Sequence, residues 1–296
     1  MKPNTLTRKL FLVLAVGASL VFVASTAQAA ETHNRLATNR LATNRLATNR
    51  LATNRLATNA LSSGNLEANP DTAELLQTED GREVYYYVVS CALPEGTDIQ
   101  ATIPEAPDSA PPDTGYTCVS GQCVFPGSLG LADYWQDRKL DPKGQRWITA
   151  CLLARVNLHD TADAISLRGT APSLTVGQGE AEIYVVQEGA FYGNIFTDSE
   201  DLDWNACRGS GQASGEFGGL ALRDCAEPDP NNPGFTMCGL KYAGDCADFE
   251  PSVPTPYACR SFEADEGTYS DCHAEEGAGH WASRPYRQVI TTYVSP

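Results

Sequence analysis

Residues 141 to 159 read DPKGQRWITACLLARVNLH, and this stretch predicts a helix at the centre of the fold. Asp141 and Pro142 can cap and open a helix, because a carboxylate accepts hydrogen bonds from first-turn N–H groups and proline suits the first turn. Apolar residues then recur four, three and four positions apart, which places them on one helical face: Trp147, Cys151, Ala154 and Leu158. Cys151 is therefore expected on an apolar stripe.

A second helix is one of two interpretations of the residues before Cys91. Thr78, followed by Glu79 and Asp80, can start a helix. One face of that helix would carry Val84, Tyr87, Val88, Cys91 and Ala92. The alternative is a strand, because the run VYYYVV is rich in strand-favouring residues. If both segments are helical, a bridge from Cys91 to Cys151 closes a ring of 61 residues and contributes about 4 kcal/mol.

The sequence TCVSGQCVF, residues 117–125, predicts a short hairpin with its own bridge. Ser120 and Gly121 form a two-residue turn, so Cys118 and Cys123 face each other as a pair without hydrogen bonds between them. Such pairs bring their Cα atoms to about 4.5 Å, which a disulfide accepts. A ring this short contributes about 2 kcal/mol.

The N-terminal residues 1–29 have the features of a secretory signal peptide. Lys2, Arg8 and Lys9 precede the apolar run LFLVLAVGASLVFVA, and the small residues around Ala29 suit cleavage. The run is shorter than the roughly 20 residues of a transmembrane helix, and no later segment is apolar enough to cross a bilayer. We therefore expect a secreted, periplasmic or surface-exposed product.

Export makes a disulfide framework the natural interpretation of the ten cysteines, all of which follow the repeat. No closely spaced pair of the C-x₂-C type indicates structural zinc. Six C-terminal cysteines allow 15 pairings. Pairing of sequence neighbours predicts bridges 207–225, 238–246 and 259–272, formed by Cys207, Cys225, Cys238, Cys246, Cys259 and Cys272.

Residues 30–65 contain a tandem repeat, with four copies of LATNR at 36–55 and a variant LATNA at 56–60. A five-residue period advances about 500° on a helix and alternates faces on a strand, so neither element gains a buried side. This favours a disordered tether. A fragment of a pentapeptide solenoid and a basic adhesive arm are the alternatives.

Charge separates the repeat from the rest of the chain. The formal net charge is −16, and residues 60–296 carry 13 Lys and Arg against 36 Asp and Glu. Such a surface repels phosphate backbones and anionic lipid, so nucleic acid and membrane are poor partners. Divalent cations and basic proteins suit it better, although a solvated acidic surface also explains the composition.

The segment TDSEDLDWNACRG offers oxygen ligands for Ca²⁺ from Asp198, Glu200, Asp201 and Asp203. It is not an EF-hand loop, since Ala206 replaces the required glycine and Gln212 the terminal glutamate. The alternative is a solvated acidic loop.

No catalytic or cofactor-binding residue is predicted, because the chain lacks H-E-x-x-H, a phosphate-binding loop and S-x-x-K. Ser128 in PGSLG resembles a nucleophile elbow, but Pro126 stands where that motif has glycine, so a turn is favoured. His273, Glu276 and His280 could surround a metal or be ordinary surface residues.

Two aromatic stretches, YGNIF at 192–196 and GHWASRPY at 279–286, could line a ligand groove. Tyr192 and Phe196 have the spacing of one helical face, so packing in the core is the favoured interpretation.

The fold class expected for residues 66–296 is a single α+β domain with a loop-rich, disulfide-stapled part at 207–285. Strands are predicted at 98–103, 164–167, 181–186 and 287–294, and an exposed loop at 105–113.

A resemblance accompanies these segments. The stretches YYYVVSCALPEG, GLADYW, QRWITACLLARVN, ISLRG, EGAFYGNIF and VITTYV are similar to a family of uncharacterised secreted myxobacterial proteins. The resemblance covers most of residues 78–294. It implies export and a shared cysteine-bearing fold, and it implies no activity.

The sequence thus favours a secreted binding or structural module with an unknown extracellular ligand. A secreted hydrolase whose active-site residues are dispersed along the chain, or a secreted inhibitor or effector, is the alternative.

Overall fold

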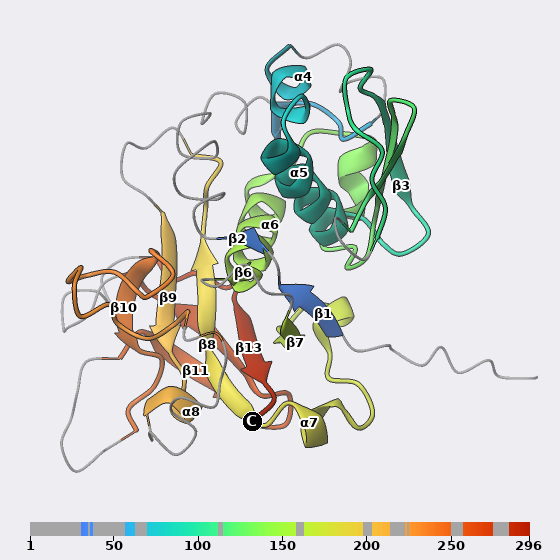
Figure 1. The fold of residues 1–296 in the computed structure, drawn as a ribbon. Coiled ribbons are helices and arrows are strands. Elements are labelled where there is room, and N and C mark those ends of the chain that lie inside the picture. The colour runs from blue at the N-terminus through green and yellow to red at the C-terminus, as the bar shows by residue number, and fades with distance from the viewer. Residues whose placement is uncertain are drawn as a thin grey trace, which may run out of the picture.

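The computed structural model describes residues 31–34, 36–37, 57–62, 70–111, 115–157, 163–197, 203–213, 223, 225–249, 257–274 and 284–296. Within these ranges the protein is an α+β fold in which one lobe carries two helices and a small sheet, and the other carries a six-stranded sheet (Figure 1). No helix in these ranges is long and apolar enough to cross a membrane. The predicted signal peptide lies outside the described residues.

Both predicted core helices are present, as α5 (Glu79–Ala92) and α6 (Pro142–Ala154), with α4 (Pro70–Leu76) before them. The Thr78 hydroxyl accepts a hydrogen bond from Gly81 N at 3.1 Å. Asp141 Oδ1 accepts one from Gly144 N at 2.8 Å. The run VYYYVV is therefore helical, because a cap and an apolar face outweigh the strand propensity of its residues.

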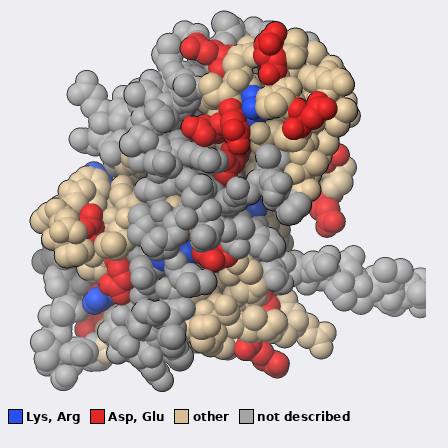
Figure 2. Space-filling model, in the orientation of Figure 1, with Lys and Arg blue, Asp and Glu red and all other residues tan. Residues whose placement is uncertain are grey.

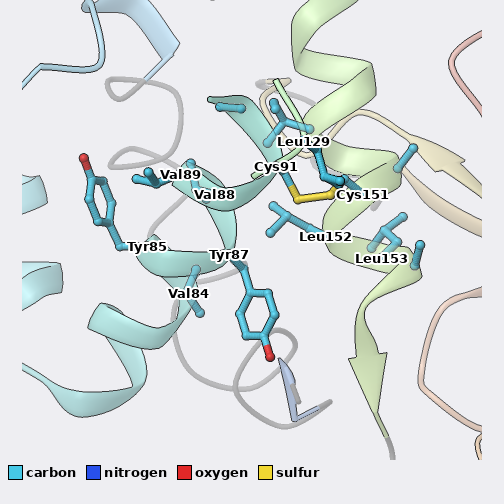
Figure 3. Packing of buried hydrophobic residues seen from close by; sticks show 14 of the residues in the cluster. Val84, Tyr85, Tyr87, Val88, Val89, Cys91, Leu129, Cys151, Leu152 and Leu153 are labelled. Carbon is cyan, nitrogen blue, oxygen red and sulfur yellow. A yellow bond between two sulfur atoms is a disulfide. The ribbon is translucent and has the colours of Figure 1, made fainter. Parts of the chain in front are cut away.

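The Cys91–Cys151 bridge joins the apolar faces of α5 and α6, with a Cα–Cα distance of 6.1 Å. Figure 3 shows this bridge among Val88, Leu129 and Leu152. These side chains belong to a core that extends from α5 through α6 to the large sheet. Helix α6 packs against α5 and against strand β8 (Val186–Gly193), so it connects the two lobes.

The small sheet has the order β3-β5-β4 and contains the predicted hairpin. Cys118 and Cys123 are directly opposite and bonded, with Cα atoms 4.1 Å apart. Ser120 and Gly121 have φ values of 50° and 77°, as a type I′ turn requires. The strands are β3 (Asp98–Thr102), β4 (Thr117–Val119) and β5 (Gln122–Pro126).

The large sheet has the order β1-β7-β13-β8-β9-β10, and its central strands are antiparallel. The predicted strands at 164–167 and 287–294 correspond to β7 and the shorter β13. Their bounds, with the other strands, are β1 (Glu31–Asn34), β7 (Asp163–Arg168), β8 (Val186–Gly193), β9 (Trp204–Arg208), β10 (Lys241–Asp245) and β13 (Ile290–Val294).

The strand predicted at 181–186 is wrong, because residues Glu180–Ile183 form the short helix α7 and β8 begins only at Val186. The Glu180 carboxylate accepts a hydrogen bond from Gly177 N at 2.8 Å, which closes the turn leading into α7. The helical spacing inferred for Tyr192 and Phe196 is also wrong: Tyr192 lies in β8, which ends at Gly193, and Phe196 follows the strand. Both side chains are nevertheless buried, as core packing predicts.

Two parts of the predicted tether contact the domain. Strand β1 lies antiparallel to β7, and β2 (Leu36–Ala37) pairs in parallel with β6 (Val156–Asn157). At the other end of the repeat, Trp135 Nε1 donates a hydrogen bond to the carbonyl of Asn59 at 2.9 Å. Leu61 is buried there. The repeat is thus attached at both ends, and residues 38–56 lie outside the described part.

Three bridges fix the C-terminal part, and only one of them joins the predicted pair. Cys259 and Cys272 face each other across the hairpin of β11 (Cys259–Glu263) and β12 (Thr268–Cys272). The predicted bridges 207–225 and 238–246 are wrong. The observed bridges are Cys207–Cys246 and Cys225–Cys238. Strands β9 and β10 are parallel neighbours, and this sheet pairing brings Cys207 to Cys246 despite their separation in sequence.

Candidate functional site

The structure describes one of the four calcium candidates, Asp203. Its Oδ1 accepts hydrogen bonds from Tyr286 Oη at 2.6 Å and from Asn205 Nδ2 at 3.2 Å. This oxygen therefore holds the aromatic segment in place. Asp198, Glu200 and Asp201 lie outside the described residues, so the calcium hypothesis stays a prediction.

His273, expected among surface residues, is fully buried. Its carbonyl accepts a hydrogen bond from Tyr192 Oη at 2.6 Å, so its backbone is part of the core. The other members of the possible metal group, Glu276 and His280, lie outside the described residues. Ser128 is exposed, and its N–H donates to the carbonyl of Leu93 at 2.7 Å, which places it in a segment that packs at the end of α5.

Three buried sulfur atoms lie within 4.8 Å of one another, on Cys207, Cys246 and Cys259. The Sγ atoms of Cys207 and Cys259 are 3.7 Å apart although each belongs to a different bridge. All three are disulfide-bonded, so none is a thiolate ligand in this structure.

Among the described residues, one ion pair is fully buried, between Glu188 of β8 and Arg223. Arg223 Nε is 3.1 Å from Glu188 Oε1, and both side chains are fully buried. Thr292 donates to the other carboxylate oxygen at 2.6 Å, and Arg223 donates to the carbonyl of Ala154 at 2.6 Å. These contacts tie the segment at 223 to α6 and β13, and they leave the pair inaccessible to a ligand.

A groove at the start of α6 is the best candidate for a ligand site. It consists of two adjoining cavities of about 740 and 400 Å³, which share Lys143, Arg287 and Gln288. Four segments converge on it: the loop at 130–134, the first turns of α6, the loop at 170–173 and the residues before β13. We refer to these two cavities as the α6 groove.

The capped start of α6 builds one wall. Lys143 and Trp147 are four residues apart, so both reach the larger cavity. Arg146 lies one residue before Trp147 and lines the smaller cavity. The sequence that begins the helix therefore also supplies a cation to each cavity.

Gly144 allows the loop at 130–134 to approach this wall. A Cβ atom at position 144 would lie 2.3 Å from Tyr134 Oη and 2.6 Å from Leu140 Cδ1, which is too close. Burial and the nearby carboxylate of Asp141 raise the pKa of Tyr134 to about 12, so its hydroxyl is neutral at physiological pH. Arg138 lies over the Tyr134 ring, 4.5 Å from its centroid.

The opposite wall, residues 284–288, is attached to the C-terminal disulfide hairpin. Tyr286 N donates to the carbonyl of Cys272 at 2.8 Å, and Cys272 N donates to the carbonyl of Tyr286 at 3.0 Å. Arg284 and Arg287 lie on either side of Tyr286 in the sequence. The Cys259–Cys272 bridge holds Cys272 in place, and the two hydrogen bonds between Cys272 and Tyr286 in turn position the backbone next to both arginines.

The cations of the groove have few acidic partners. Lys143, Arg146 and Arg284 form no ion pair with any residue in the described part of the chain. Arg146 lies over the Tyr286 ring at 5.4 Å, and its buried Nε has no hydrogen-bond partner among these residues. Arg287 Nε is 3.4 Å from Asp271, in a pair that is largely exposed. Asp133 is the acidic residue that lines the larger cavity.

The positive charge of the groove contrasts with the acidic surface of the neighbouring lobe. Figure 2 shows acidic side chains gathered over the lobe of α4, α5 and β3, with few basic ones on that face. Four of the 13 Lys and Arg of residues 60–296 line the α6 groove. Others are inaccessible, as the buried Arg82, Arg155, Arg168 and Arg223 show. The groove is thus a positively charged site on an acidic protein.

The sequence analysis singled out one stretch that contributes to this groove, but it did not predict an anion-binding site. GHWASRPY was named as a possible groove-lining stretch for its aromatic residues; the described residues of it that line the smaller cavity are Arg284 and Pro285, which are not aromatic. Lys143, Arg146 and Arg287 were missed, because they are separated in the sequence and each is unremarkable alone. A usable signal in the sequence was that Lys143 and Arg146, two of the few basic residues of the domain, lie at the start of a predicted helix.

The chain matches no family model, no curated protein and no solved structure in the three comparisons made.

Proposed function

We propose that this protein is an exported binding module that captures an anionic ligand in the α6 groove. The observation that carries the proposal is the gathering of Lys143, Arg146, Arg284 and Arg287 around two adjoining cavities on a chain of net charge −16. Three of these cations, Lys143, Arg146 and Arg284, have no acidic partner among the described residues, so an added anion there competes with no carboxylate from this part of the chain.

Three further features support a binding role. The five disulfides and the absence of a membrane-spanning helix among the described residues suit an exported protein. Both walls of the groove are rigidly held, one by the capped helix and one by the Cys272–Tyr286 pairing. A site held by rigid elements loses less conformational entropy on binding. The acidic surface elsewhere directs anions away from other positions.

The test is calorimetric titration of the full exported chain with citrate and with inorganic pyrophosphate at low ionic strength. We expect saturable binding that weakens as added salt shortens the Debye length. Lys143→Glu combined with Arg284→Glu should abolish it. The matched control combines Lys241→Glu with Lys139→Glu, which reverses two charges outside both cavities.

An unchanged melting temperature in both double variants would show that folding is intact. Absence of any binding by the unmodified protein would contradict the proposal. Equal loss of binding in the groove variant and in the control would also contradict it, since the effect would then come from overall charge.

A further inference from the structure

We infer that the ligand of the α6 groove is a segment of a uronic-acid polysaccharide, a chain of hydroxyl-rich sugar rings that each carry a carboxylate. This inference rests on the anion-binding function proposed above and adds the chemical class of the ligand. Its basis is that the smaller cavity is lined mainly by cations and the larger one by aromatic and hydroxyl groups, while Lys143, Arg287 and Gln288 line both.

The smaller cavity is suited to carboxylates. Arg146, Arg284 and Arg287 line it together with Lys143. Guanidinium groups bind carboxylates through two parallel hydrogen bonds, and a stacked guanidinium is already oriented for this geometry. Arg146 is such a group, since its guanidinium lies over the Tyr286 ring, 5.4 Å from the ring centroid.

The larger cavity is suited to the uncharged part of a sugar. Trp147 and Tyr134 supply aromatic surface, and Thr170 and Ser173 supply hydroxyl groups. Asp133 adds a carboxylate that accepts hydrogen bonds from hydroxyl donors and repels a second anion. At about 740 Å³ this cavity is of the size that holds organic ligands rather than a bare ion.

Two other classes of anionic polymer fit less well. A peptide commonly binds by adding a strand to an open sheet edge, but prolines that lack an N–H donor border this groove, at Pro142, Pro172 and Pro285. Duplex nucleic acid carries a charge about every 1.7 Å, so a segment reaching beyond the groove would meet the acidic surface. A uronic-acid chain carries one carboxylate per sugar ring, so a segment of up to four rings brings no more anions than the groove has cations.

The experiment titrates the full exported chain with three probes of equal length: an oligogalacturonate, its carboxyl-reduced neutral counterpart, and an oligoglutamate peptide. We expect saturable binding of the oligogalacturonate and at least tenfold weaker binding of the other two. Arg284→Gln with Arg287→Gln should weaken oligogalacturonate binding by about tenfold per arginine. The Lys241→Gln variant is the control and should bind like the unmodified protein.

The outcomes separate this inference from the proposed function. If oligoglutamate binds as tightly as oligogalacturonate, the sugar class is refuted and anion binding stands. If the neutral sugar binds equally well, the role of the carboxylates is refuted. If citrate binds in the groove and oligogalacturonate does not, the inference alone fails. If none of these anions binds, both fail.

Discussion

Residues 70–157 fold around large apolar side chains, whereas residues 204–274 close around small side chains and sulfur. In the first region Tyr85, Phe125, Trp135 and Leu152 are buried in one extended core. The second region contributes most of a separate buried cluster, in which four of the ten members are cysteines: Cys207, Cys246, Cys259 and Cys272. Apolar burial contributes in proportion to area, so the second region has less of it and depends more on covalent bridges.

The comparison indicates in which region the fold depends on its disulfide bridges. In the helical region a disulfide adds to a structure that packing already specifies. In the C-terminal region the bridges replace packing, and one of them supports the wall of the α6 groove that contains Arg284 and Arg287. Stability and ligand binding should therefore respond differently to loss of bridges in the two regions.

The largest expected effect is removal of both Cys207–Cys246 and Cys259–Cys272 by alanine substitution. The loop-entropy estimate assigns these rings about 4 and 3 kcal/mol. We expect hydrogen exchange to show lost protection in β9, β10, β11 and β12, while α5 and α6 retain theirs. Uniform loss of protection over the whole chain would contradict the comparison.

Removal of the Cys91–Cys151 bridge should destabilise the protein by about 4 kcal/mol without changing its fold. The helices remain packed through Val88, Leu129 and Leu152. Denaturant unfolding of Cys91→Ala with Cys151→Ala measures the change, and circular dichroism at low denaturant checks the fold. Loss of helical signal before unfolding would show that the bridge, not the packing, specifies α5 and α6.

Cys272→Ser should cost about 3 kcal/mol and also rearrange a bridge. It frees Cys259, whose sulfur is 3.7 Å from Cys207 Sγ. Attack of the Cys259 thiolate on Cys207 would form a 207–259 bond and release Cys246 as the free thiol. Peptide mapping after alkylation identifies that thiol. The control is Cys151→Ser, where we expect the label on Cys91; a label remaining on Cys259 would refute the exchange.

Leu61→Ala tests the attachment of the repeat to the domain, and we expect a loss of about 2 to 3 kcal/mol. Leu61 is 1% exposed, and its N–H donates to the carbonyl of Trp135 at 2.7 Å. The exposed Thr58→Ala is the comparison variant and should change the unfolding free energy far less. Equal, small effects would mean that residues 57–62 do not contribute to the core.

The smallest expected effect concerns the cap of α6. Burial opposes ionisation of Asp141, but hydrogen bonds from the first-turn N–H groups, Gly144 foremost, hold its pKa below the usual 3.8. The charge therefore stabilises the fold above pH 3.8, and this contribution disappears as the pH falls through the lower folded-state pKa.

Asp141→Ala should cost about 1 kcal/mol at pH 7. Asp141→Asn retains a capping oxygen, so it should cost less, and its difference from the unmodified protein should vanish in acid. Urea unfolding at pH 7 and at pH 3 or below measures both. A difference that grows on acidification would contradict the assigned direction of the pKa shift.

The sequence predicted correctly those features that depend on residues close together in the chain. The Asp141 cap, the helical face that holds Cys91, and the Ser120–Gly121 turn all depend on residues close together in the chain. The bridge between Cys207 and Cys246 depends on β9 lying parallel to β10, which no spacing of cysteines reveals. Strand β1 was missed for a related reason, since its pairing with β7 joins distant segments.

The α6 groove was beyond sequence reasoning because its cations meet only in three dimensions. Lys143 and Arg146 belong to a helix, while Arg284 and Arg287 lie about 140 residues later, in a segment placed by its pairing with Cys272. The deficit of basic residues in the domain was visible in the composition. The gathering at one place of four of the nine basic residues that are not buried was not visible there.

The most direct test of the central claim is to map the bound ligand on the isotope-labelled protein by amide chemical shifts. Titration with the oligogalacturonate should move the amide signals of Lys143, Gly144, Arg284 and Arg287 together, with one saturation curve. Signals of Lys241 and of the acidic lobe around α4 and β3 should stay in place. Saturable shifts at those other positions, with the groove amides unmoved, would contradict the account.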